Sequence, residues 1–258
     1  IVPSVEILTP TDQQVIGKSE VMVEWRVVED WPTRQRIYVD GLLRETRSPG
    51  GVHEWVDSCT ISGLSDGNHT ITIEVEDQVG HRGRASVTVI IDTMLPNITI
   101  RLPLYVSSIN VTAEVVAEDA NPSYVEAFLD GNLIGNFTWE RTSETFLLQL
   151  TNLAEGQHNL TVIGYDRAGY NSTDTWVFYV DITPPAVSIV TPATGSFLNV
   201  TTVVVNWTYS DASPTVFDLF LDEQLYATKL VNTSIVIPDL AVGQHILEIV
   251  ATDAAGNN

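Results

Sequence analysis

One segment that ends in histidine recurs three times in this chain of 258 residues, and an aspartate follows each histidine eight residues later. The copies are Leu64–His69, Leu153–His158 and Leu240–His245, followed by Asp77, Asp166 and Asp253. Other landmarks repeat with the same spacing of 87 to 93 residues: Pro10, Pro103 and Pro192, then Asp40, Asp130 and Asp222, then Asp92 and Asp181. A repeat of this length without helical periodicity predicts a tandem array of small β domains, and such arrays more often space, display or bind than catalyse.

Apolar and polar residues alternate within each copy. In the run that follows His69, Ile71, Ile73 and Val75 share one face, which is the pattern of a half-buried strand. Module one contains about seven such runs, near 5–9, 21–27, 35–39, 42–46, 54–61, 69–76 and 84–91. Short strands at this spacing predict an all-β fold of three immunoglobulin-like sandwiches placed end to end. We define them as module one, module two and module three, residues 1–92, 93–181 and 182–258.

Module three is shorter than the others. Modules one and two continue after their Asp-x-x-Gly turn into a last strand, at 84–91 and 173–180, whereas module three stops at Asn258 directly after that turn. We therefore expect module three to lack its final strand. Either the protein continues or another chain supplies that strand.

Several motifs resemble prokaryotic immunoglobulin-like repeats of large cell-surface proteins. These are an Asp-Gly turn after the third strand, Gly-x-His at the start of the sixth strand, Asp-x-Ala-Gly-x-Asn at 166–171 and the linker Val-Asp-Ile-Thr-Pro-Pro at 180–185. The resemblance covers the whole chain, and module one departs from it with Asp-Gln-Val-Gly-His at 77–81. It implies the fold and a location at the cell surface, without one particular activity. The two prolines of the linker leave little slack between modules, which predicts a stiff rod.

The net charge limits the classes of partner that the chain can bind. With 33 acidic and 12 basic residues the net charge is −21, and every module is acidic. Such a surface repels nucleic acid and anionic lipid, and no stretch is apolar enough for a spanning helix. The single cysteine, Cys59, excludes an intrachain disulfide. We expect neither a nucleic-acid partner nor membrane contact in this segment.

Nine of the fourteen asparagines stand in Asn-x-Ser/Thr sequons. Ser and Thr make up 45 of the 258 residues, so chance would place only two or three there. The excess predicts covalent N-glycans on a surface protein, although Thr-rich strands also create sequons by accident. The nine are Asn68, Asn97, Asn110, Asn136, Asn159, Asn171, Asn199, Asn206 and Asn232.

Three aspartates are expected to converge at each junction between modules. In this fold the loops after the second and sixth strands lie at the end where the chain enters a module, beside the last aspartate of the preceding one. The sets are Asp92, Asp119 and Asp166 at the first junction and Asp181, Asp211 and Asp253 at the second. Clustered carboxylates suit calcium, with Glu118 and Asn121 as further ligands. The alternative is that each aspartate only caps its own turn.

Three recurring histidines and two tryptophans are the remaining candidate residues. His69, His158 and His245 repeat with the fold, so we expect a structural role such as bonding a loop carbonyl. Trp31 and Trp139 do not share the inward parity of core residues and are candidate partner contacts, although a tryptophan can equally cover the core.

These patterns together favour a non-catalytic segment. No phosphate loop, Gly-x-Ser-x-Gly or His-Glu-x-x-His motif is present, and the carboxylate pairs recur with the fold. The leading hypothesis is an N-glycosylated structural or adhesive segment of a prokaryotic, in particular archaeal, cell-surface or extracellular filament or S-layer protein. Its partners would be other copies of itself, or cell-surface proteins and glycans. The alternative is a carbohydrate-binding or spacer region of a secreted hydrolase.

Overall fold

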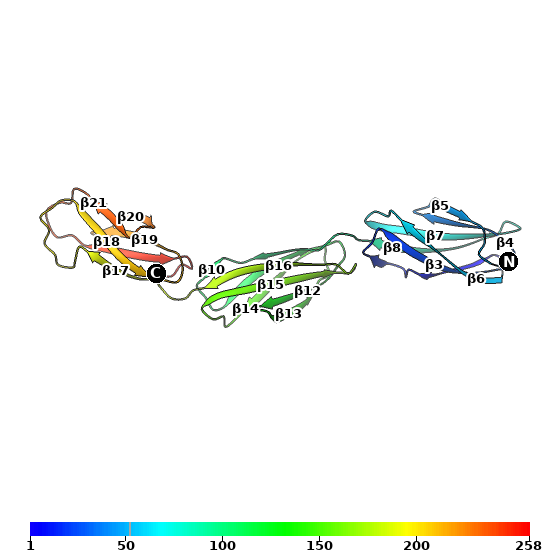
Figure 1. Ribbon diagram of the computed structural model, residues 1–258, viewed down its shortest axis with the longest axis horizontal. Helices are drawn as coiled ribbons and strands as arrows, with labels where there is room; N and C mark the ends of the chain where they lie inside the picture. Colours follow the sequence, from blue (N-terminus) through cyan, green and yellow to red (C-terminus); the bar gives the residue numbers. More distant parts are fainter. Residues whose placement is uncertain (52) are drawn as a thin grey trace.

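The computed structural model describes residues 1–51 and 53–258, and the described residues form strands, turns and loops without a helix. The three modules follow one another along the long axis, with the amino terminus at the outer end of module one (Figure 1). The described residues contain no helix that is long and apolar enough to cross a membrane. The chain is therefore an all-β array of three immunoglobulin-like sandwiches.

The described residues of module one form eight strands in two layers, and most neighbouring strands are antiparallel. One sheet has the order β1-β3-β6 and the other the order β2-β8-β7-β4-β5. The strands are β1 (Ser4–Thr9), β2 (Gln14–Ile16), β3 (Glu20–Glu29), β4 (Pro32–Val39), β5 (Leu42–Arg47), β6 (His53–Ser62), β7 (Gly67–Asp77) and β8 (Arg82–Ile91). All seven expected strands are present. The additional β2 pairs in parallel with β8, and its three residues are too few to show an alternating pattern.

Module two repeats this arrangement. Its sheets have the orders β14-β11-β9 and β10-β16-β15-β12-β13. The strands are β9 (Asn97–Arg101), β10 (Tyr105–Val106), β11 (Val111–Glu118), β12 (Pro122–Leu129), β13 (Asn132–Thr138), β14 (Ser143–Leu150), β15 (Gly156–Asp166) and β16 (Asn171–Val180). The short β10 pairs in parallel with β16, as β2 does with β8.

Module three has two three-stranded sheets, β17-β18-β21 and β20-β19-β22. The strands are β17 (Ala186–Thr191), β18 (Val203–Ser210), β19 (Thr215–Leu221), β20 (Gln224–Leu230), β21 (Ser234–Ile237) and β22 (Leu247–Asp253). Among the described residues no strand corresponds to β8 or β16.

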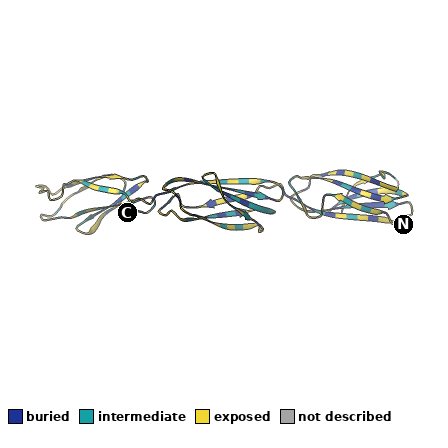
Figure 2. Cartoon of the chain, turned by 90° about the horizontal axis from the view of Figure 1, so that it is seen from below, coloured by how far each residue is buried: buried dark blue, intermediate teal, exposed yellow. Residues whose placement is uncertain are grey.

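Each module encloses its own apolar interior. The strands are banded by buried and exposed residues, because alternate side chains point into and away from the sandwich (Figure 2). Three separate clusters of buried residues result, around Trp25 in module one, Trp139 and Phe178 in module two, and Trp207 and Phe217 in module three. None of these clusters contains residues of two modules. Because no apolar core is shared, neighbouring modules are connected through the linkers and the turns that lie beside them.

Candidate metal centres at the module joints

Two clusters of three aspartates lie at the joints. At the first joint one carboxylate oxygen from each of Asp92, Asp119 and Asp166 lies within 4.8 Å of the other two. The second joint brings together Asp181, Asp211 and Asp253 in the same way. In each cluster the first aspartate belongs to the linker, the second follows a strand, β11 or β18, and the third ends a strand, β15 or β22. The six aspartates expected at the junctions thus form two clusters in the structure.

The linker aspartates are anchored to the module that they leave. The backbone N–H of Asp92 donates to the carbonyl of Ile16 in module one at 3.1 Å. In the same way the N–H of Asp181 donates to the carbonyl of Val106 in module two at 3.0 Å. Each cluster therefore joins an oxygen fixed to one module with two carboxylates of the next.

One oxygen of every carboxylate is used by its own turn. In all six aspartates Oδ1 accepts a backbone N–H from two or four residues later, at 2.6 to 3.2 Å. The capping role that sequence reasoning held as the alternative is therefore present. It fixes the orientation of the carboxylates and leaves each Oδ2 for another partner.

Two of these remaining oxygens are buried without a hydrogen-bond partner among the described residues, namely Oδ2 of Asp166 and Oδ2 of Asp181. The two residues are only 6% and 4% exposed. A buried carboxylate oxygen without a donor is costly, by about 1–3 kcal/mol for a polar group and more when it is charged. A hard cation with an affinity for oxygen ligands would remove this cost. The donor set therefore fits calcium.

The first joint also shows electrostatic strain. Burial raises the pKa of Asp119, and the nearby charges of Asp92 and Asp166 raise it further, while a hydrogen bond from the Asn121 backbone opposes the shift. Burial likewise raises the pKa of Asp166, with a smaller contribution from Asp92. No lysine, arginine or histidine of the described residues forms a salt bridge with any of the six joint aspartates. The negative charges are left without a protein counterion.

The side-chain amide of an asparagine contacts each aspartate cluster, but the two asparagines occupy different positions in their modules. At the first joint Asn121 Nδ2 donates to Asp92 Oδ2 at 2.7 Å. At the second joint Asn257 Nδ2 donates to Asp253 Oδ2 at 2.7 Å and to the carbonyl of Asp181 at 2.8 Å. Asn121 was expected at this place, whereas Glu118 lies outside the cluster and accepts hydrogen bonds on the sheet surface. Asn257 was not predicted as part of the second cluster, although it stands only four residues after Asp253.

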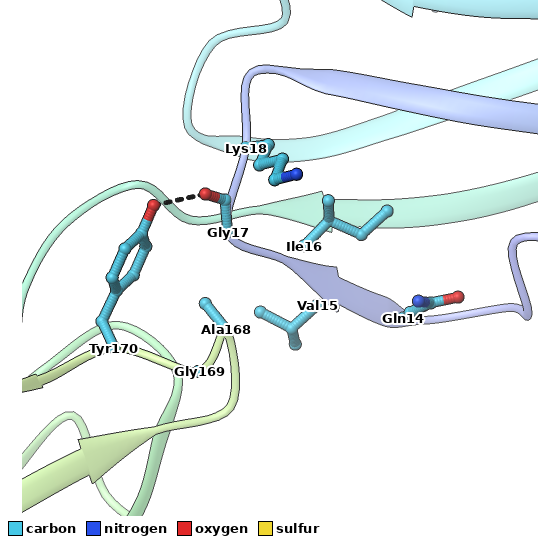
Figure 3. Close-up of a pocket in the computed structure, with 8 residues that line it drawn as sticks. All are labelled: Gln14, Val15, Ile16, Gly17, Lys18, Ala168, Gly169 and Tyr170. Atoms are coloured by element: carbon cyan, nitrogen blue, oxygen red, sulfur yellow. Dashed lines mark hydrogen bonds between the residues drawn. The ribbon is translucent and has the colours of Figure 1, made fainter.

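The first joint contains a direct contact between modules that the sequence did not reveal. Tyr170, four residues after Asp166, donates its hydroxyl to the backbone carbonyl of Gly17 in module one. Figure 3 shows this bond at the edge of a shallow groove between 14–18 of module one and 168–170 of module two. The corresponding residue at the second joint is Asn257, which bonds to the linker and its own turn. We call the Tyr170–Gly17 contact the tyrosine latch.

The recurring histidines have a structural role. His158 Nδ1 lies 2.7 Å from Asp130 Oδ2, and its Nε2 lies 2.8 Å from the carbonyl of Ala154. The same pair of contacts recurs in the other modules, for His69 with Asp40 and Ser65, and for His245 with Asp222 and Ala241. The expected bond to a loop carbonyl is confirmed. The aspartate partner was missed, although its repeat spacing matched that of the histidine.

The sequon asparagines lie on the surface. Eight of the nine are exposed and Asn206 is half-buried. In module two, strand register places Asn136, Asn159 and Asn171 on the same outer face of the five-stranded sheet. Module one carries only Asn68. All nine sites are thus accessible to a modifying enzyme, at least in part.

The two candidate contact tryptophans differ. Trp31 is 67% exposed in the turn between β3 and β4, as a partner contact requires. Trp139 is 1% exposed and belongs to the core of module two, so the structure contradicts its expected role as a contact. Its backbone N–H donates to the carbonyl of Ser123, and a Cβ on Gly164 would lie 3.5 Å from its ring. The loop position alone did not show this.

No protein-family model and no curated protein matches the chain. Similar solved structures include the fibronectin(III)-like modules of Clostridium thermocellum CbhA, 17% identical over 68% of this chain and 93% of that chain, with a TM-score of 0.39. A structure from a 1.5-MDa bacterial ice-binding adhesin is 20% identical over 100% of this chain and 94% of that chain, with a TM-score of 0.35. The ICAM-5 D1–D4 ectodomain fragment is 14% identical over 96% and 75%, with a TM-score of 0.43. These similarities concern the fold.

Proposed function

We propose that this chain is a non-catalytic spacer segment of a cell-surface or extracellular protein, in which one calcium ion at each joint holds neighbouring modules in a rigid rod. The observation that carries this proposal is the composition of the two aspartate clusters. Each combines a carboxylate fixed to one module with two carboxylates of the next, so a single ion at either joint would bind both modules at once.

Calcium would act on the joints by removing repulsion. Three ionised carboxylates within 4.8 Å of one another repel each other in a partly buried site. Asp92, Asp119 and Asp166 would hold the ion at the first joint, and Asp181, Asp211 and Asp253 at the second. A divalent cation supplies the missing positive charge and the partner for the free Oδ2 atoms of Asp166 and Asp181. Without it, the modules would separate and reorient about the linkers.

Small-angle X-ray scattering of the whole chain tests this function. In calcium we expect a narrow distribution with a large maximum dimension, and in EDTA a broader distribution from bent conformers. Asp181→Asn keeps the Oδ1 acceptor of its turn and removes the charge, so it should loosen the second joint in calcium as well. Glu248→Gln, at an exposed acid of module three five residues along β22 from Asp253, is the matched control. Identical scattering curves in calcium and EDTA would contradict the proposal.

N-glycosylation of modules two and three is the second part of the proposed function. Eight of the nine accessible sequons belong to these modules. Glycans there would cover the middle and far end of the rod and leave module one barer. Intact mass of the protein from its native host, before and after enzymatic deglycosylation, measures the modification. A mass equal to that of the unmodified polypeptide would disprove it.

The setting that we propose is an archaeal or other prokaryotic surface filament or lattice, in which copies of the chain contact each other or other surface proteins and glycans. The joint carboxylates sit in turns that recur with the fold, which favours a structural role over catalysis. The exposure of Trp31 favours one alternative, a carbohydrate-binding region of a secreted hydrolase. Binding on a glycan array that Trp31→Ala abolishes would support that alternative, whereas assembly into fibres or lattices would support the surface filament.

A further inference from the structure

Module one carries four arginines on the outer face of its five-stranded sheet, in a chain whose net charge is −21. Strand register places them in two rows across β4, β7 and β8. One row is Arg36, Glu74 and Arg84, and the other is Arg34, Glu76 and Arg82. We call these four arginines, with the two glutamates between them, the arginine face.

The carboxylates of the arginine face lie beneath its guanidinium groups. The side chain of Glu74 is 0% exposed and that of Glu76 is 20% exposed, whereas Arg82 and Arg84 are 49% and 59% exposed. Arg36 and Arg84 bond to opposite oxygens of Glu74, at 2.5 and 2.6 Å. Arg34 is exposed and has no salt bridge among the described residues. The surface offered to a partner is therefore cationic, with N–H donors to spare.

The same face of module two carries an acidic residue and sequons in place of the arginines. Glu126 occupies the position of Arg36, and Asn136, Asn159 and Asn171 place three sequons there. The sequon of module one, Asn68, lies six residues along β7 from Glu74, which corresponds to about 20 Å of extended strand. Glycans at all these sites would leave the arginine face free.

We propose that the arginine face binds an acidic polysaccharide. Guanidinium groups pair with carboxylate or sulfate groups through two parallel hydrogen bonds, which suits a polymer that carries such groups at regular spacing. Trp31 is 67% exposed and stands three residues before Arg34, about 10 Å along the chain, where its indole can stack on a sugar ring. The rest of the chain repels such a polymer, so binding is confined to module one.

A sugar polymer fits this face better than an acidic protein surface does. Stable protein interfaces have an apolar core within a polar rim. The row beside the arginines is Leu43, Tyr38, Thr72 and Ser86, in which Leu43 is exposed and the hydroxyls of Thr72 and Ser86 bond to each other at 2.8 Å. One exposed leucine beside hydroxyl and guanidinium groups does not make an apolar core, so this face offers mainly hydrogen bonds and charge.

Binding of the whole chain to immobilised polygalacturonate and heparin tests this proposal, with neutral dextran as the uncharged surface. EDTA is present throughout, so calcium cannot bridge the polymer to acidic residues, and failure of the calcium joints leaves the test intact. We expect binding to both acidic polymers and not to dextran, weakening as salt screens the charges. Arg34→Gln removes no salt bridge and should weaken binding about tenfold, the effect of one charge-assisted hydrogen bond.

Arg101→Gln is the matched control, because Arg101 is an exposed arginine of module two that pairs with Glu114. It should bind as the wild type does, and Trp31→Ala should weaken binding to both polymers. Thermal unfolding verifies that each variant is folded. Failure to bind either polymer, or equal binding by Arg34→Gln, would overturn the proposal. Self-association of the chain that Arg34→Gln abolishes, without polysaccharide binding, would assign the face to a second copy instead.

Discussion

The hydroxyl of Tyr170 in module two donates a hydrogen bond to the carbonyl of Gly17 in module one, across a sequence separation of 153 residues. Only glycine fits at the accepting position. A Cβ on residue 17 would lie 2.9 Å from the carbonyl oxygen of Ala168 and 3.1 Å from the Tyr170 ring. The first joint thus combines the tyrosine latch with an aspartate cluster. At the second joint Asn257 stands in the position of Tyr170 and bonds to the linker backbone.

Tyr170→Phe should loosen the first joint. The substitution removes the hydroxyl and leaves the Gly17 carbonyl without this donor, at a cost of about 1 kcal/mol in module docking. Pulsed electron paramagnetic resonance between spin labels on modules one and two measures the distribution of distances across the joint. We expect a broader distribution in EDTA than for the wild type. Tyr226→Phe, at a partly exposed tyrosine of module three, is the control, and equal widths for wild type and Tyr170→Phe would refute the latch.

Glu223→Gly should stabilise module three. Asp222 and Glu223 form its hairpin turn with φ values of 51° and 64°, whereas modules one and two have glycine at the second position, with φ of 78° at Gly41 and 80° at Gly131. A side chain in this left-handed region costs about 1 kcal/mol relative to glycine. Differential scanning calorimetry should show one transition shifted upward. The reciprocal Gly131→Glu should lower a different transition, and no shift in either variant would contradict this account.

Stability should fall as the pH rises through the pKa of the recurring histidines. Burial lowers the pKa of His158, but the Ala154 carbonyl and Asp130 carboxylate outweigh it, so the pKa lies above its ordinary value of 6.5. The pKa of His69 and of His245 is raised by equivalent partners. A raised folded-state pKa means that the protonated ring stabilises the fold. This contribution is complete below the unfolded-state value and is lost above the folded-state value.

Chemical denaturation at pH values on both sides of 6.5 measures this effect. His158→Gln should reduce the fall in unfolding free energy between acidic and alkaline pH. Gln244→Asn, at an exposed residue beside His245 that has no titratable group, should leave the fall unchanged. A wild-type stability that rises over this range would be the opposite of the expected result.

Protons should compete with calcium at the first joint. Burial, together with neighbouring carboxylates, raises the pKa of Asp119 and Asp166, so both carboxyl groups take up protons at a higher pH than exposed aspartates do. Without metal, this joint is destabilised as the pH rises through those pKa values, because the charged forms are the disfavoured ones. Calcium affinity should therefore decline as the pH falls. Titration of Asp181→Asn, which weakens the second joint by removing one of its three carboxylates and leaves the first joint unchanged, measures this, and pH-independent affinity would count against it.

The repeat and its alternating parity were sufficient to predict the fold. Both properties are local, since a two-residue period specifies a half-buried strand and a recurring landmark specifies a module. The aspartate clusters followed from the fold, because its loops determine which turns meet at a joint. For this reason Asp92, Asp119 and Asp166 could be grouped although 74 residues separate the first and last.

Features that depend on one particular side chain could not be predicted in this way. The tyrosine latch occurs once, so no repeat signals it, and it depends on how two modules dock. Trp139 lies beyond the last residue of an edge strand, where parity no longer tells whether a ring turns inward. The arginine face consists of residues that are separated in sequence and become neighbours only through strand register.

Isothermal titration calorimetry of the calcium-free chain with calcium tests the central claim most directly. We predict two ions for each wild-type chain, and one ion for Asp166→Asn and for Asp181→Asn, because each substitution removes charge from one cluster and keeps the Oδ1 atom that caps the turn. The double variant should bind none at these sites. A wild-type chain that binds no calcium, or single variants that still bind two ions, would contradict the account.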